Sequence, residues 1–144
     1  AYEQILKLDS DQTEARIGLA MTLESQGKED QALRNFQMAL EKQPENVNLL
    51  TSTAWLLATH SDVSKRDPQQ AKLLAERAWN ASGHQAPLAA DALAAAYAGL
   101  ERFDRAVEIA ELAIQAAQKF ELTQLASEIK LHLEQYKQGQ KLRN

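Results

Sequence analysis

The sequence predicts an all-α fold built from repeated helix pairs, and three observations lead to that prediction. Alanine, the strongest helix former, clusters in runs such as Ala94-Ala95-Ala96. The 144 residues include only 5 glycines and 3 prolines, which is few for a chain of many strands and turns. One pattern of small and apolar residues returns three times along the chain. The length itself predicts a single domain over residues 1–144.

Charge and cysteine content weigh against several function classes. Lys and Arg number 16 against 20 Asp and Glu, a net charge of −4, whereas nucleic-acid binders usually carry a basic stripe. With no cysteine, the chain has no disulfide framework and no thiolate metal site. No apolar run approaches the roughly 20 residues of a membrane helix, so we expect no direct membrane insertion. The composition fits a soluble domain, but it leaves open whether the compartment is the cytoplasm or the periplasm.

The repeated unit accounts for most of the chain. In the first copy its pattern is Leu19-Ala20, Leu23, Ala32, Phe36, Ala39 and Pro44, and it returns from Thr53-Ala54 and from Leu93-Ala94. The copies span residues 13–46, 47–86 and 87–120. The second copy is longer by about six residues, most of them between Ala58 and Ala71. A single helix pair cannot bury its own apolar face, so we expect the copies to stack.

The first elements follow from apolar spacing. In residues 1–10, Tyr2, Ile5 and Leu6 fit the second helix of a repeat whose beginning is absent. Because the chain starts without Met and already in a helical pattern, we expect a fragment of a longer protein. A helix is predicted over 13–26, ending near Gly27, and another over 29–42, where apolar residues recur at helical spacing.

The later elements follow from start and stop signals. Helices are predicted over 47–59, 68–82, 87–99 and 103–118. Asp67 before Pro68 is a typical start, because Asp caps free amides and Pro suits the first helical position; Pro87 does the same. A last helix over 122–137 ends near Gly139 and has a polar side that suits a capping helix over residues 121–138.

This spacing resembles the tetratricopeptide repeat, a 34-residue helix–turn–helix unit, over nearly the whole chain. The resemblance implies a right-handed α-α superhelix of about three helix pairs, plus the N-terminal half repeat and the C-terminal capping helix. Three positions depart from the family pattern. Arg16 replaces the usual aromatic, Glu101 replaces the usual turn glycine, and Gly83 stands where Pro is expected.

A narrower resemblance concerns the longer second unit and the Ala-rich helix after it. The stretch from Ala54 to Thr59, Arg66-Asp67 and the run Asp91–Tyr97 are similar to C-terminal repeat arrays of larger bacterial proteins. Some of those proteins are membrane-attached and glycosyltransferase-like. One alternative function is therefore the non-catalytic C-terminal region of such a protein. Another is a structural module that self-associates, for which the truncated N-terminal end offers exposed apolar surface.

In a superhelix of this family the first helix of each pair lines the concave face. Side chains there that do not enter the stack are candidates for partner contact. In the first two units these include Glu14, Ile17, Met21, Glu24, Asn48, Thr51, Trp55 and Thr59, and in the third Leu88, Asp91, Ala95 and Ala98. We take Ile17, Met21, Glu24, Asn48, Thr51, Trp55 and Asp91 as the predicted partner-binding residues. Some relatives bind a C-terminal carboxylate through paired Lys and Asn, a pairing that this face lacks.

Three residue types, Trp, His and Asp, need a structural interpretation beside a functional one. Trp55 is either a binding hot spot or core packed under the loop 59–67, and Trp79 is expected in the core. His60, His84 and His132 share no metal-ligand spacing and are expected at the surface or its boundary. Asp67 is expected to cap a helix within a solvated loop, residues 61–67.

No catalytic constellation is visible. No glycine-rich phosphate loop and no serine in a nucleophile elbow are present. The sequence therefore predicts a non-enzymatic scaffold that binds a peptide or partner domain, with no cofactor and no metal.

Overall fold

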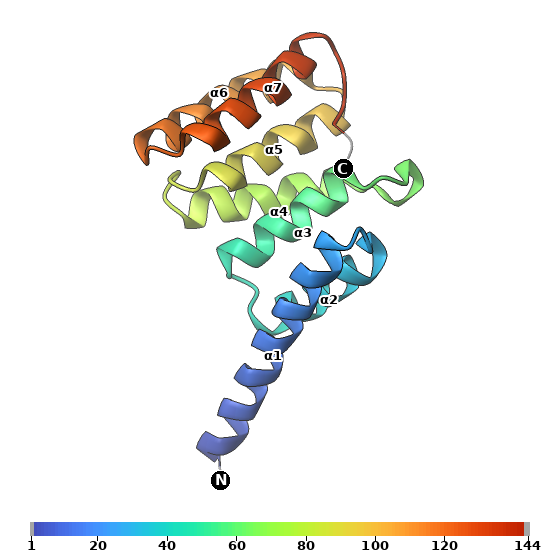
Figure 1. The fold of residues 1–144 in the computed structure, drawn as a ribbon, viewed down its shortest axis with the longest axis vertical. Coiled ribbons are helices and arrows are strands. Elements are labelled where there is room, and N and C mark those ends of the chain that lie inside the picture. Colours follow the sequence, from blue (N-terminus) through green and yellow to red (C-terminus); the bar gives the residue numbers. More distant parts are fainter. Residues whose placement is uncertain (1, 143–144) are drawn as a thin grey trace.

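The chain is all α in the computed structural model (Figure 1), which describes the backbone of residues 2–142 and the side chains of residues 4, 8, 9 and 11–142. Within residues 2–142 there are seven α-helices, one 3₁₀ turn and no strand. The elements are α1 (Tyr2–Ser25), α2 (Glu29–Lys42), α3 (Val47–Thr59), η1 (Val63–Lys65), α4 (Pro68–Ala81), α5 (Pro87–Gly99), α6 (Phe103–Lys119) and α7 (Thr123–Lys137). The all-α prediction is confirmed.

The helices pack in sequential pairs. Each helix contacts the next one along the chain, and α3 also packs against α5. The result is a layered stack that runs from α1 and α2 at one end to α6 and α7 at the other (Figure 1). Short turns join most helices, which makes neighbours in sequence neighbours in space.

Side-chain caps explain where several helices begin. The Asn46 side chain accepts a hydrogen bond from the Leu49 amide at 3.1 Å, and Asp67 accepts one from the Gln70 amide at 3.1 Å. These caps satisfy amides that have no partner within the helix. Gly27 has φ of 77° and Gly139 has φ of 69°, a left-handed conformation that ends a helix without steric cost. The start predicted from Asp67 and Pro68 is confirmed.

Small residues form the contacts between helices. Six alanines of the helix pairs are almost completely buried: Ala20, Ala39, Ala54, Ala78, Ala94 and Ala113. Helix α5 is buried continuously from Ala89 to Ala98 because other helices cover it on all sides. Helix α3 divides its side chains between two apolar clusters. Leu49 and Leu56 pack with α1 and α2, whereas Leu50 and Leu57 belong to the larger cluster that continues into α7.

The N-terminal helix differs from the prediction. Two helices were expected, one within residues 1–10 and one from about residue 13, but α1 is continuous from Tyr2 to Ser25. No glycine or proline precedes Gly18, and the Thr13 hydroxyl donates to the Asp9 carbonyl at 2.9 Å, as a side chain does inside a helix. The predicted apolar contacts of Tyr2, Ile5 and Leu6 lie outside the described side chains. In Figure 1 the first half of α1 extends beyond the stack.

One apolar position of the repeat pattern is also placed differently. Leu19 was expected in the core beside Ala20, but its side chain is 50% exposed. On a helix, successive residues point about 100° apart, so burial of Ala20 turns Leu19 away from α2. No helix among residues 2–142 has the length and apolar character needed to cross a membrane.

Candidate functional site

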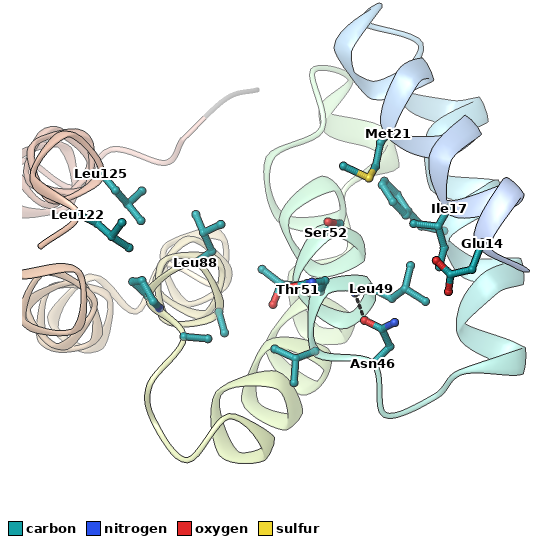
Figure 2. A pocket seen from close by; sticks show the side chains of 16 residues that line it. Glu14, Ile17, Met21, Asn46, Leu49, Thr51, Ser52, Leu88, Leu122 and Leu125 are labelled. Carbon is teal, nitrogen blue, oxygen red and sulfur yellow. Dashed lines mark hydrogen bonds between the residues drawn. The ribbon is translucent and has the colours of Figure 1, made fainter. Parts of the chain in front are cut away.

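Two adjoining hollows form a groove along one face of the stack. The first, here called the apolar hollow, has a volume of about 530 Å³ (Figure 2). Its side chains come mainly from α1, α3, α5 and α7: Glu14, Ile17, Met21, Phe36, Asn46, Val47, Asn48, Leu49, Thr51, Ser52, Ala86, Pro87, Leu88, Ala89, Leu122 and Leu125. Every second helix of the chain thus contributes to one surface.

The second hollow, here called the acidic hollow, has a volume of about 320 Å³ and continues the first. It is lined by Glu24, Thr51, Ser52, Trp55, Leu88, Asp91, Leu125, Glu128 and His132. The two hollows share Thr51, Ser52, Leu88 and Leu125. They are therefore one groove with an apolar end and an acidic end.

The structure brings all seven sequence-predicted site residues to this groove. Ile17, Met21 and Asn48 line the apolar hollow, Glu24, Trp55 and Asp91 line the acidic hollow, and Thr51 lines both. Figure 2 shows Met21, Ile17 and Glu14 on one wall and Leu88, Leu122 and Leu125 on the opposite one. They meet because they lie on the first helices of successive pairs.

Other sequence expectations for this face were wrong. Ala95, Ala98, Thr59 and Asp91 were expected to be available for contact, but all four are buried, and of these only Asp91 lines the groove. Among the lining residues that sequence reasoning missed are Leu122, at the N-cap of α7, and Leu125, Glu128 and His132 within that helix. That helix was treated as a cap only, although the 3- and 4-residue spacing from Leu122 to His132 could have indicated a second groove wall.

Asp91 lies at the base of the acidic hollow and has a partner. It is 3% exposed, and its Oδ1 lies 2.9 Å from Nδ1 of His132. Burial acts against a charge on His132, but the hydrogen bond to Asp91 and the charges of Asp91 and Glu128 outweigh it, so the pKa of His132 is raised. This pair fixes α7 against α5.

Glu24 and Glu128 supply negative charge to the acidic hollow. Burial raises the pKa of the half-buried Glu24 carboxyl, and the charge of Glu29 raises it further. Among the described residues that line either hollow, none is Lys or Arg. The only basic side chain there is His132, which is already bonded to Asp91.

Trp55 lines both the acidic hollow and a third hollow, whose volume is about 370 Å³. Its ring is half-buried against the core, and its centroid lies 5.7 Å from that of His132. The third hollow is lined by Trp55, His132, Gln135, Gln140, Lys141 and Leu142. Trp55 therefore combines core packing with a groove-lining position. Trp79 is buried, as predicted, and stacks on His84 at a centroid distance of 4.8 Å.

His60 is the clearest error among the histidine predictions. It was expected at the surface or its boundary, but it is only 4% exposed. Its Nε2 lies 2.8 Å from Asp30 Oδ1, and its Nδ1 accepts a hydrogen bond from the Asp62 amide at 3.0 Å. Lys65 also pairs with Asp30. The loop over residues 61–67 is solvated, as expected, with only Arg66 half-buried, and these bonds attach it to the start of α2.

The described part of the chain contains no group of three or more His, Asp or Glu side chains that could hold a metal ion. No protein-family model matches the sequence. A search of curated proteins likewise gives no match.

Proposed function

We propose that this chain is a non-enzymatic protein-interaction scaffold of tetratricopeptide type, a right-handed superhelix whose groove binds a segment of a partner protein. The sequential helix pairs and the alanines between them support the repeat assignment. The observation that carries the function is the groove itself, because residues from four helices line it.

The character of the groove wall supports a protein ligand. Met21, Leu88 and Leu122 are large apolar side chains that remain exposed there, and Ile17 and Leu125 are half-buried beside them. Clustered exposed apolar side chains rimmed by polar groups are typical of protein-binding surfaces. The polar groups at the rim include Asn48, Glu14 and Glu24.

A selection from a random twelve-residue peptide library tests this proposal. The immobilised chain and two variants serve as targets. Leu88→Asp places a charge in the groove, where Leu88 is 54% exposed, and Leu73→Asp is the matched control on α4, where Leu73 is 46% exposed and lines neither hollow. We expect selected peptides to bind the wild type and Leu73→Asp but to lose at least about tenfold in affinity for Leu88→Asp, since a buried apolar anchor is worth about 1.5–3 kcal/mol.

The opposite result is also defined. Circular dichroism first establishes that both variants keep the helical content of the wild type. If folded Leu88→Asp then binds the selected peptides as tightly as the wild type does, the groove is not the binding site. Light scattering over a concentration series separates the remaining alternative, self-association, from a monomeric scaffold.

A further inference from the structure

We infer that the partner segment presents a lysine or arginine side chain to the acidic hollow, where it lies between Glu24 and Glu128 and against the ring of Trp55. The inference rests on the proposed binding function, because it states which chemistry the groove selects.

The first step is the charge of the groove. Four carboxylates line the two hollows: Glu14, Glu24, Asp91 and Glu128. His132 is the one basic side chain among the described lining residues, and it is bonded to Asp91, so no Lys or Arg of the groove neutralises the remaining carboxylates. A cleft that carries one sign of charge between low-dielectric walls concentrates ions of the opposite sign.

The second step is that two of these carboxylates are available. Asp91 is bonded to His132, but no hydrogen bond or ion pair holds the Glu24 or Glu128 carboxylate within the described part of the chain. They come from α1 and α7, at opposite ends of the helix order, and line the same hollow. The raised pKa of Glu24 indicates a partly desolvated charge without compensation. A cation placed beside it would offset part of that cost by charge attraction.

The third step is the aromatic wall. Trp55 lines the same hollow, and a tryptophan face attracts a Lys or Arg cation within about 6 Å of its centroid. The methylene stem of either side chain can pack on the apolar ring while its charged end reaches a carboxylate. A metal ion or a small inorganic cation would use the carboxylates but not this wall.

The chain itself offers a precedent beside Trp55. In the third hollow, Leu142 is buried in the core while Lys141 stays exposed, with its Nζ 3.3 Å from Oε1 of Glu101. An apolar residue next to a basic one thus already lines a hollow with this indole, and the basic side chain is paired to a carboxylate. A partner segment with apolar residues in the apolar hollow and a basic residue in the acidic one would repeat that arrangement. An acidic segment would instead bring like charges together in a half-desolvated site.

The experiment is a double-mutant cycle on the peptides selected above. Each peptide is synthesised with its basic residue and with an uncharged equivalent of similar length, norleucine for Lys or citrulline for Arg. The protein is compared with the variant Glu24→Gln/Glu128→Gln and with the matched control Glu41→Gln/Glu111→Gln, which removes two exposed carboxylates that line neither hollow.

We expect the selected peptides to share a Lys or Arg. Removing the charge of that peptide residue should weaken binding to the wild type and to the control variant by about tenfold. The same change should alter binding to the groove variant by less than about twofold, because that variant lacks the Glu24 and Glu128 carboxylates that pair with the charge. Raising the salt concentration should weaken only the pairs that retain both charges.

The outcomes separate the two proposals. If the peptides need an intact Leu88 but share no basic residue, or if the cycle shows no coupling, the basic-residue inference is overturned and the binding groove stands. If no selected peptide distinguishes wild type from Leu88→Asp, the binding proposal and this inference fall together.

Discussion

The Oδ1 atom of Asp91 lies 2.9 Å from Nδ1 of His132 and thereby joins α5 to α7 beneath the acidic hollow. These residues are 41 positions apart in the sequence. A carboxylate that is 3% exposed needs a partner, and the imidazole supplies one. The bond also fixes the helix that carries Glu128, so the shape of the groove depends on it.

The first prediction concerns pH. Because the folded pKa of His132 is raised, protonation of this imidazole stabilises the fold. That contribution is fully present below the ordinary histidine pKa of about 6.5 and is lost as pH rises through the folded value. The loss of unfolding free energy caused by His132→Gln should therefore be about 1 kcal/mol larger at pH 5.5 than at pH 8.5. This extra loss is the difference between a charged and a neutral hydrogen bond.

Urea denaturation at both pH values measures this difference. The control is Asp91→Asn, which removes the carboxylate and should return the NMR-monitored titration of His132 toward the ordinary value. An equal stability difference at both pH values would show that the charge of His132 contributes nothing to the fold.

The second prediction concerns the tautomer of His60. A backbone amide can only donate, so Nδ1, which accepts from the Asp62 amide, carries no proton. In neutral His60 the proton then lies on Nε2 and is donated to Asp30. Nitrogen-15 NMR of the imidazole should show the Nε2–H tautomer. His60→Leu should cost about 1–3 kcal/mol of unfolding free energy, because it leaves the Asp62 amide without its acceptor. Detection of the Nδ1–H form would contradict the arrangement.

Helix positions could be predicted from sequence because their signals are local. Asp67 and Pro68 predicted the start of α4, where the Asp67 side chain indeed caps the helix. The region around Asp9 and Thr13 was wrongly interpreted as a break between two helices. Its Asp, Ser and Thr residues are weak helix formers that favour caps and turns, but no glycine or proline interrupts it, and α1 continues through it.

The groove could be predicted only in part. Ile17, Met21 and Thr51 recur on the first helices of their pairs, so repeat spacing brought them to one face. The partners of His60 and His132 lie 30 and 41 residues away, and no periodicity relates them. Burial of a polar residue depends on such distant partners, so sequence reasoning wrongly placed the buried His60 near the surface, whereas His132 is half-buried, in agreement with its predicted boundary position.

The third prediction tests the alanine contacts. Ala94 is fully buried within α5, and a larger side chain there would collide with neighbouring helices. Ala94→Leu should lower the unfolding free energy by about 1–3 kcal/mol. Ala81→Leu is the control, because Ala81 is exposed and Leu is nearly as good a helix former as Ala. Thermal denaturation of the two variants should show a loss for Ala94→Leu alone; equal midpoints would mean that the stack tolerates wider spacing.

The fourth prediction uses two glycines that lie within helices. A Cβ added at Gly99 would lie 2.8 Å from Cβ of Pro68, the first residue of α4, whereas one added at Gly18 in α1 would meet nothing within 4 Å. Gly99→Ala should therefore destabilise the chain by about 1–3 kcal/mol through this clash. Gly18→Ala should stabilise it by about 0.5–1 kcal/mol, because alanine restricts the unfolded chain and favours helix.

Chemical denaturation of both variants measures the two signs. The substitution is chemically the same at each site, so opposite effects can come only from the surroundings of the added methyl group. A stabilised Gly99→Ala would mean that α4 and α5 can separate at this point without cost. In that case, the close approach of Pro68 would not be the reason why position 99 holds a glycine.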